Sequence, residues 1–154
     1  KLAAVEDEQG NIIPKIKISE NTAKITNPHY KKLYRFYDNE SGKALADELC
    51  VYDETIDSTK PHTIFDPDAI WKTKTLTDYT ARELHVTVFK NGELVYKQPS
   101  LYEIRIYCAE QLETLWDEVK RFENPHTYYV DLSKKLWDIK NALLEKSKDG
   151  KDLK

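Results

Sequence analysis

Basic residues cluster between residues 14 and 35, and they are the side chains of this sequence best suited to binding a ligand. The segment reads PKIKISENTAKITNPHYKKLYR and sets a single acidic residue, Glu20, against six basic ones: Lys15, Lys17, Lys24, Lys31, Lys32 and Arg35. The 154-residue chain has a formal net charge of -3, so this positive charge is local. Lysine carries a flexible point charge that suits phosphate groups. The cluster therefore predicts either a site for a phosphorylated ligand or a solvated basic strand face.

Residues for catalysis or metal binding are sparse. No metal-ligand spacing such as HxxxH links the four histidines: His29, His62, His85 and His126. Each is interpreted as a surface or half-buried side chain. Asp66 and Asp68 in FDPDAIW could hold a cation, but aspartates beside proline usually form hydrogen bonds within turns. The four glycines form no phosphate-binding loop. The sequence therefore predicts no catalytic group and no metal site.

Composition narrows the class of protein and its partners. Cys50 and Cys108 lie far apart without CxxC or CxxH neighbours, which predicts free thiols in a reducing compartment such as the cytoplasm. No apolar run approaches the roughly 20 residues of a membrane helix, so no membrane partner is expected. A pI near 5.9 and one short basic stripe argue against nucleic acid.

Period-2 patterns in the first two thirds of the chain predict three hairpins. The first pairs residues 2–5 with 12–19, and there the lysines of the basic cluster alternate with Ile16 and Ile18, which places them on the opposite face. The second joins KKLYRFYD to ALADELCVYD through NESGK. The third joins ELHVTVF to ELVYK through KNGE, whose Asn91-Gly92 pair suits a type I′ turn. Between the second and third hairpins, the Pro-, Thr- and Asp-rich residues 53–80 are expected to be irregular.

Helical patterns follow from residue 100 onward. Ser100 and Glu103 have capping-box spacing. They precede an apolar stripe at helical period: Leu101, Ile104, Cys108, Leu112, Leu115, Val119 and Phe122. A second helix is expected to begin near Asp131 or Ser133 and to face four residues inward: Leu132, Leu136, Ile139 and Leu143. The predicted fold class is α+β, with antiparallel β-hairpins followed by a C-terminal two-helix unit.

Four stretches of the sequence resemble one enzyme family in the same order and spacing. They are PKIKISENTAKITNPHYKKLYRFYD, TARELHVTVFKNGELVY, PSLYEIRIYCAEQLETLWDEVKRFENPH and YYVDLSKKLWDIKNALL. These stretches are similar to the C-terminal part of the nicotinate phosphoribosyltransferase family, and the likeness runs from Lys1 to about Leu144. The resemblance implies an enzyme of NAD salvage that forms nicotinate mononucleotide from nicotinate and phosphoribosyl pyrophosphate, with Mg and ATP hydrolysis.

The resemblance also implies a division of the chain within that larger enzyme, a type II phosphoribosyltransferase that contains an α/β barrel. Residues 1–55 would complete its sheet domain, residues 56–98 would form an irregular connection and a hairpin, and residues 99–154 would form a C-terminal helical region. The expected partners are the upstream barrel domain and a second subunit in a homodimer. Methionine is absent even at position 1, so we expect the chain to be a fragment that is inactive alone.

Two lysines acquire an expected role from the resemblance. Lys1 and Lys17 match basic residues that, in related enzymes, lie near the active-site phosphates of a neighbouring subunit. His29 departs from the family pattern, which usually has glycine after the NP of the basic segment. The alternative hypothesis is a stand-alone anion-binding or protein-interaction module.

Overall fold

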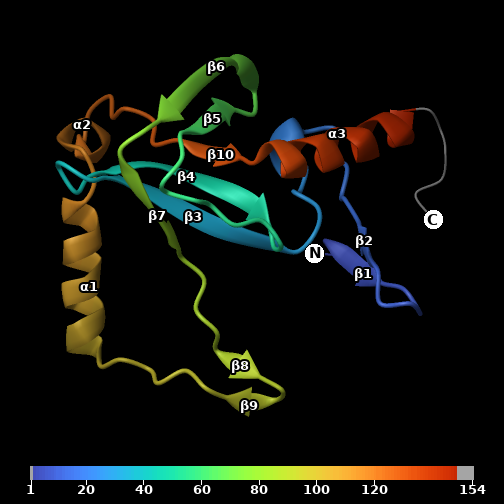
Figure 1. Cartoon of the computed structure of the whole chain (residues 1–154), viewed down its shortest axis with the longest axis horizontal. Helices are drawn as coiled ribbons and strands as arrows, with labels where there is room; N and C mark the ends of the chain where they lie inside the picture. The colour runs from blue at the N-terminus through green and yellow to red at the C-terminus, as the bar shows by residue number, and fades with distance from the viewer. Residues whose placement is uncertain (1, 149–154) are drawn as a thin grey trace.

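A four-stranded sheet forms the centre of the computed structural model, which describes residues 2–148 (Figure 1). Its strands lie in the order β10 (Val130–Leu132), β4 (Ala44–Val51), β3 (Lys31–Asp38) and β7 (Tyr79–Glu83). β3 pairs antiparallel with β4 and β7, and β10 pairs parallel with β4. The sheet thus takes strands from all three predicted segments, and the predicted α+β class is confirmed.

The hairpin of β3 and β4 follows the sequence prediction. Tyr34 and Phe36 of β3 are buried, as their spacing of two requires. The turn is fixed by Asp38, whose carboxylate accepts a hydrogen bond from the backbone N–H of Ser41 at 2.8 Å, and by Gly42, whose φ is 68°. Glycine adopts that left-handed conformation without a steric penalty. A register shift at Phe36 and Tyr37 makes a β-bulge near the turn.

A second hairpin covers one face of the sheet, where the sequence predicts an irregular connection. β5 (His62–Asp66) pairs antiparallel with β6 (Ala69–Leu76). The prediction of irregular chain over residues 53–80 is therefore wrong. Between its buried ends Ala69 and Leu76, β6 exposes every residue, so no apolar alternation marks it. The main core cluster joins this hairpin to the sheet and consists of Phe36, Ala46, Ile64, Leu76 and Tyr79.

The last strand and the last helix close the far end of the sheet. β10 leads through Ser133 into α3 (Lys134–Lys148), which confirms the predicted start of the second helix. Ser133 accepts a hydrogen bond from the backbone N–H of Leu136 at 3.2 Å and donates one to the Glu54 carboxylate at 2.7 Å. Leu136 is fully buried against Val51 and Leu132 in a second core cluster.

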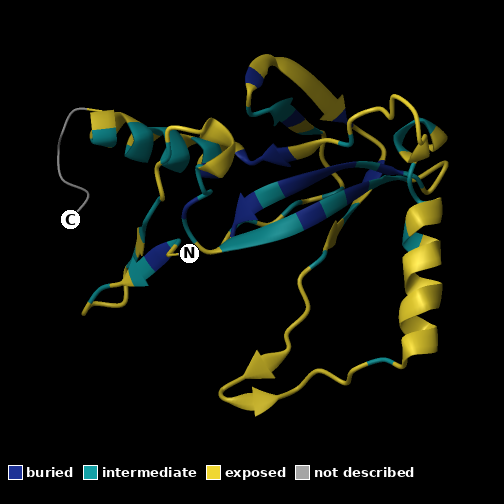
Figure 2. Ribbon diagram, turned by 180° about the vertical axis from the view of Figure 1, so that it is seen from behind, coloured by how far each residue is buried: buried dark blue, intermediate teal, exposed yellow. Residues whose placement is uncertain are grey.

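Helix α1 (Leu101–Glu113) lies at the opposite end of the sheet from α3 (Figure 1). The predicted capping box between Ser100 and Glu103 is present. The helix ends at Glu113, however, and the predicted continuous stripe is interrupted before the short α2 (Asp117–Lys120). No residue of α1 is buried (Figure 2). Among the described residues, no helix is long and apolar enough to cross a membrane.

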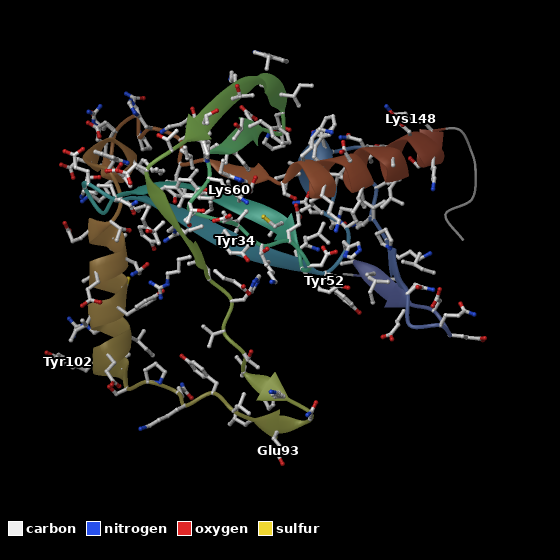
Figure 3. The ribbon with its side chains drawn as sticks, in the orientation of Figure 1. Tyr34, Tyr52, Lys60, Glu93, Tyr102 and Lys148 are labelled. Atoms are coloured by element: carbon white, nitrogen blue, oxygen red, sulfur yellow. The ribbon has the colours of Figure 1, made fainter. Side chains whose placement is uncertain are left out.

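An extended arm connects β7 to α1. It carries β8 (Phe89–Lys90) and β9 (Glu93–Leu94), which flank Asn91 and Gly92 with φ angles of 52° and 84°. These positive values agree with the predicted type I′ turn. The two strands are only two residues long, and all four of their residues are exposed. In Figure 3, Glu93 at the tip of the arm and Tyr102 on α1 lie away from the four-stranded sheet.

Candidate functional site

The basic segment begins at the end of the first hairpin, formed by β1 (Ala4–Glu6) and β2 (Ile12–Pro14). Asp7 shapes its turn, because its carboxylate accepts hydrogen bonds from the backbone of Gln9 at 3.0 Å and of Asn11 at 2.8 Å. After Pro14 the pairing continues for one bond only, from the N–H of Lys15 to the carbonyl of Ala3 at 2.8 Å. The rest of the basic segment before β3 contains no strand, only the 3-10 helix η1 (Thr22–Lys24).

Lys17 lies on this non-strand part and is exposed. Its backbone is held in place by Thr26, whose hydroxyl accepts from the Lys17 N–H at 3.0 Å and whose N–H donates to the Lys17 carbonyl at 3.3 Å. Among residues 2–148, the Lys17 ammonium contacts no acceptor. The predicted alternation is wrong here, since Ile18 is 41% exposed once the strand has ended. Lys1, the other predicted phosphate ligand, lies outside the described residues.

Lys31 stabilises the turn before β3. Its ammonium donates to the carbonyls of Asn27 at 3.0 Å, Pro28 at 3.2 Å and His29. Burial lowers the pKa of Lys31, but the three carbonyl acceptors favour its charged form. This lysine is therefore occupied within the fold.

His29 adopts the conformation for which glycine is better suited. Its φ is 73°, in the left-handed region. The ring stacks on Tyr52, with centroids 5.7 Å apart, and its Nδ1 accepts the backbone N–H of Tyr30 at 3.0 Å. These contacts compensate for the backbone strain. Tyr52 lies just after β4, at the end of the sheet nearest the first hairpin (Figure 3).

Two more basic residues pair with acids on neighbouring strands. Lys32 lies 3.6 Å from Glu83. Arg35 makes a two-pronged pair with Asp47, at 2.7 Å from Nε and 2.9 Å from Nη2. The Tyr128 hydroxyl donates to the same Asp47 carboxylate at 2.9 Å. This hydrogen-bonded pair raises the pKa of Arg35, so the guanidinium serves β3–β4 packing.

Buried carboxylates on the sheet were not predicted from the sequence. Glu48 is 2% exposed, and its Oε2 lies 2.8 Å from His62 Nε2 and 3.5 Å from Cys50 Sγ. Burial and the Glu48 charge raise the pKa of the Cys50 thiol, which keeps it protonated. Asp131 stands beside Glu48 in the β10–β4 register. Burial, reinforced by the charges of Asp66 and Glu48, raises the pKa of Asp131 to about 6.

A cavity of about 610 Å³ opens next to these carboxylates. It lies between the start of β4, the β5–β6 hairpin, α2 and residues 126–131, and Asp131 is among its lining residues. Asp66 and Asp68 behave as predicted for a turn, because Asp66 accepts the backbone N–H of Asp68 at 2.9 Å. The described residues contain no group of three or more His, Cys, Asp or Glu side chains that could hold a metal ion.

The sequence contains one indication of the buried carboxylates that prediction did not use. Asp47 and Glu48 interrupt the apolar strand ALADELCV, and both are at most 5% exposed. Acids inside an apolar strand indicate buried partners elsewhere in the chain. Those partners, Arg35, His62 and Tyr128, come from three separate segments, so spacing alone could not identify them.

Comparisons with known proteins place this geometry in one family. Residues 30–140 match the family model of the nicotinate phosphoribosyltransferase C-terminal domain. The chain is 36% identical over 140 residues to a nicotinate phosphoribosyltransferase of Bacillus subtilis, and this match covers 91% of the chain and 28% of that protein. It is 32% identical over 149 residues to one of Dictyostelium discoideum, with 92% of the chain and 25% of that protein covered.

The fold agrees with a solved structure of the same name. The crystal structure of human nicotinic acid phosphoribosyltransferase superposes with a TM-score of 0.69 at 26% identity, over 77% of this chain and 24% of that one. The chain therefore spans about a quarter of the length of these relatives. The family match covers all four strands of the central sheet and all of α1 and α2. The chain belongs to the nicotinate phosphoribosyltransferase C-terminal domain family.

Proposed function

We propose that this chain is the C-terminal part of an enzyme that converts nicotinate and phosphoribosyl pyrophosphate to nicotinate mononucleotide and pyrophosphate, coupled to ATP hydrolysis. The family match over residues 30–140 is the observation that carries the proposal. The chain's share of about a quarter of its relatives supports an upstream domain in the same polypeptide. Mg and ATP would bind in the longer enzyme, where the substrate phosphates and waters supply most of the ligands of Mg.

Within such an enzyme, Lys17 is the basic side chain proposed to contact substrate phosphate. Lys31, Lys32 and Arg35 are occupied by acceptors of the fold, whereas the Lys17 ammonium has none among the described residues. Thr26 fixes the Lys17 backbone on both sides, so the stem starts from a defined position. A fixed stem with a flexible charged tip suits a phosphate presented by a neighbouring subunit, together with Lys1.

The exposed apolar side chains of the arm and α1 are proposed to form a docking surface for the upstream domain. Large hydrophobic residues of the arm and α1 stand in solvent: Val86, Phe89, Leu94, Val95, Leu101 and Tyr102 are each more than half exposed. Figure 2 shows arm and helix exposed almost throughout. Exposed apolar patches of this kind mark interaction sites. We propose that the upstream domain of the same polypeptide covers them.

The proposal is tested by assaying formation of nicotinate mononucleotide with two proteins. One is the 154-residue chain, and the other is the longer polypeptide encoded in frame upstream of it. We expect turnover only from the longer polypeptide, because transition-state stabilisation needs a preorganised, water-excluding pocket that the described residues do not form. Turnover by the chain alone would refute this division of labour. A stop codon just upstream of residue 1 would instead favour a stand-alone anion-binding or interaction module.

A further inference from the structure

The cavity beside β10 is lined by an acid, Asp131, whose carboxylate is open to the cavity. Asp131 is 3% exposed and lines the cavity. Among residues 2–148, its carboxylate forms no hydrogen bond and no ion pair. Its neighbour Glu48 is already engaged by His62 and Cys50. No side-chain oxygen of the described residues is both fully buried and unpaired, so this carboxylate is open to the cavity, where it can accept a hydrogen bond from a ligand that carries a donor.

The walls of the cavity suit a cation with an apolar body. Phe65, Trp116 and Tyr129 contribute aromatic rings to the lining. Aromatic faces attract ammonium groups and also cover methylene chains. The absence of three metal-ligating side chains together among the described residues argues against a metal ion. An organic cation is therefore the ligand class that fits both the acid and the rings.

None of the described charged groups around the cavity forms an ion pair with Asp131. They are Glu48 on β4, His62 and Asp66 on β5, Lys72 and Lys74 on β6, Glu118 on α2, and His126. Lys72 is a rim residue with a 64% exposed side chain, and its Nζ lies 3.8 Å from Asp66. Lys74 is also exposed, and neither lysine forms an ion pair with Asp131. The lysines that line the cavity therefore do not neutralise Asp131.

We propose that this cavity binds an alkylammonium group, with Asp131 as its counter-ion and the aromatic walls around its methylene groups. The group belongs either to a free small amine or to a lysine of the upstream polypeptide. The site lies near α2, at the other end of the sheet from the β1–β2 hairpin, which ends three residues before Lys17 in the sequence (Figure 1). It is therefore separate from the proposed phosphate contact, and its test does not depend on enzyme activity.

The probe is n-butylammonium, titrated into the 154-residue chain and followed by backbone amide chemical shifts in NMR spectra. The neutral isostere 1-butanol is titrated in parallel. We expect shifts around residues 126–131 with butylammonium, and binding at least tenfold weaker with butanol, since a charge-assisted hydrogen bond is lost. Binding should weaken as the pH falls through about 6, where Asp131 becomes protonated. Equal binding of the alcohol would overturn the proposal.

Two variants and one control distinguish the contribution of the Asp131 charge to binding from that of the cavity space. Asp131→Asn should weaken butylammonium binding about tenfold to hundredfold. Asp68→Asn, which changes an exposed acid outside the cavity, should leave it unchanged. Val119→Trp narrows the cavity from α2 without altering any charge and should also weaken binding, which keeps the test valid should Asp131→Asn fail to fold. Unchanged binding in either cavity variant would refute the site.

The two sources of the alkylammonium group are distinguished with the longer polypeptide. A free amine leaves the site open, so butylammonium would bind the longer polypeptide and the 154-residue chain alike. A lysine of the upstream domain would already occupy the site, so the probe would bind the 154-residue chain only. Failure of the probe to bind the 154-residue chain would overturn the proposal for both sources.

Discussion

Lys31 and Lys17 carry the same charge within one segment, yet the fold uses them differently. Lys31 closes a turn by donating to three carbonyls, and Lys17 points its ammonium at no acceptor among residues 2–148. One lysine of the basic cluster thus stabilises the fold, while another leaves its charge available to a ligand. Counting charges along the sequence could locate the cluster. It could not show which basic residues are paired within the fold, because their acceptors are carbonyls of the turn and acids on β4 and β7.

Replacing Lys17 tests its proposed contact in the longer enzyme. Lys17→Ala should lower kcat/KM for phosphoribosyl pyrophosphate about tenfold to hundredfold, because a charge-assisted contact to phosphate contributes about 1.5 to 3 kcal/mol. Lys24→Ala is the matched control, since Lys24 is another exposed lysine of the same segment. Equal effects of the two substitutions in steady-state kinetics would show that Lys17 is an ordinary solvated lysine.

A separate experiment tests whether Lys17 contacts the substrate bound by a neighbouring subunit. Lys17→Ala subunits are mixed with subunits inactivated in the upstream barrel, and heterodimers are isolated by two affinity tags. Part of the activity should return, because the intact barrel then faces an intact lysine from the other chain. Heterodimers without recovered activity would place the Lys17 contact within its own subunit or remove it.

The ionisation of Asp131 should make stability depend on pH. Its folded pKa is about 6 and its unfolded pKa is about 3.9, so the ionised form opposes folding above pH 6 and ceases to do so as the pH falls toward 4. Asp131→Asn should therefore raise the free energy of unfolding by about 1 kcal/mol at pH 7.5, less than the full pKa shift would give because solvent in the cavity screens the charge, and by less than about 0.5 kcal/mol at pH 4. Urea unfolding at both pH values measures this. A gain of the same size at pH 4, or one shared by Asp68→Asn, would contradict it.

Among the elements, two serine caps perform the same local task in different surroundings. Ser100 caps α1, which has no buried residue, whereas Ser133 is 4% exposed and links α3 to Glu54. Glu54 also accepts the backbone N–H of Val51 at 2.6 Å, so Ser133 connects the helix to the end of β4.

Removing the Ser133 cap should therefore lower the stability of the whole fold, whereas removing the Ser100 cap should affect α1 alone. Ser133→Ala should lower the global free energy of unfolding by about 1 to 2 kcal/mol, because the half-buried Glu54 carboxylate loses a donor. Ser100→Ala should cost α1 about 1 kcal/mol locally and leave global unfolding unchanged. Hydrogen exchange of α1 amides and thermal unfolding distinguish the two. A global loss in Ser100→Ala would mean that α1 packs on the fold.

The elements also show which patterns a sequence can reveal. The β3–β4 hairpin and the α3 start were predictable, because Tyr34 and Phe36 alternate with polar residues and Ser133 precedes an apolar stripe. β6 was not, since exposed residues fill it between Ala69 and Leu76 and its strand character comes from pairing with β5. The position of Asp131 beside Glu48 in the β10–β4 register was equally hidden, because parallel pairing of distant segments leaves no local pattern.

At the scale of the whole molecule, the exposed arm and α1 predict how the isolated chain behaves. The 154-residue chain should bind a hydrophobic dye such as ANS and associate at higher concentration, whereas the longer polypeptide should bind far less dye per molecule. Fluorescence titration and sedimentation velocity measure the two properties. A chain that remains monomeric at all concentrations and binds no dye would contradict the proposed docking surface.

The parallel pairing of β10 with β4 also sets an order for synthesis on the ribosome. Tyr128, which donates to the Asp47 carboxylate, is translated 81 residues after it. At about 5 to 20 residues per second, roughly 4 to 16 seconds pass between synthesis of β4 and synthesis of the segment that pairs with its edge and donates to Asp47. During that interval a nascent chain exposes an unpaired strand edge beside its polysome neighbours. Asp47 is already paired with Arg35 inside the hairpin, so Glu48 is the acid that leaves a net charge on β4 during this interval, which discourages pairing between nascent chains.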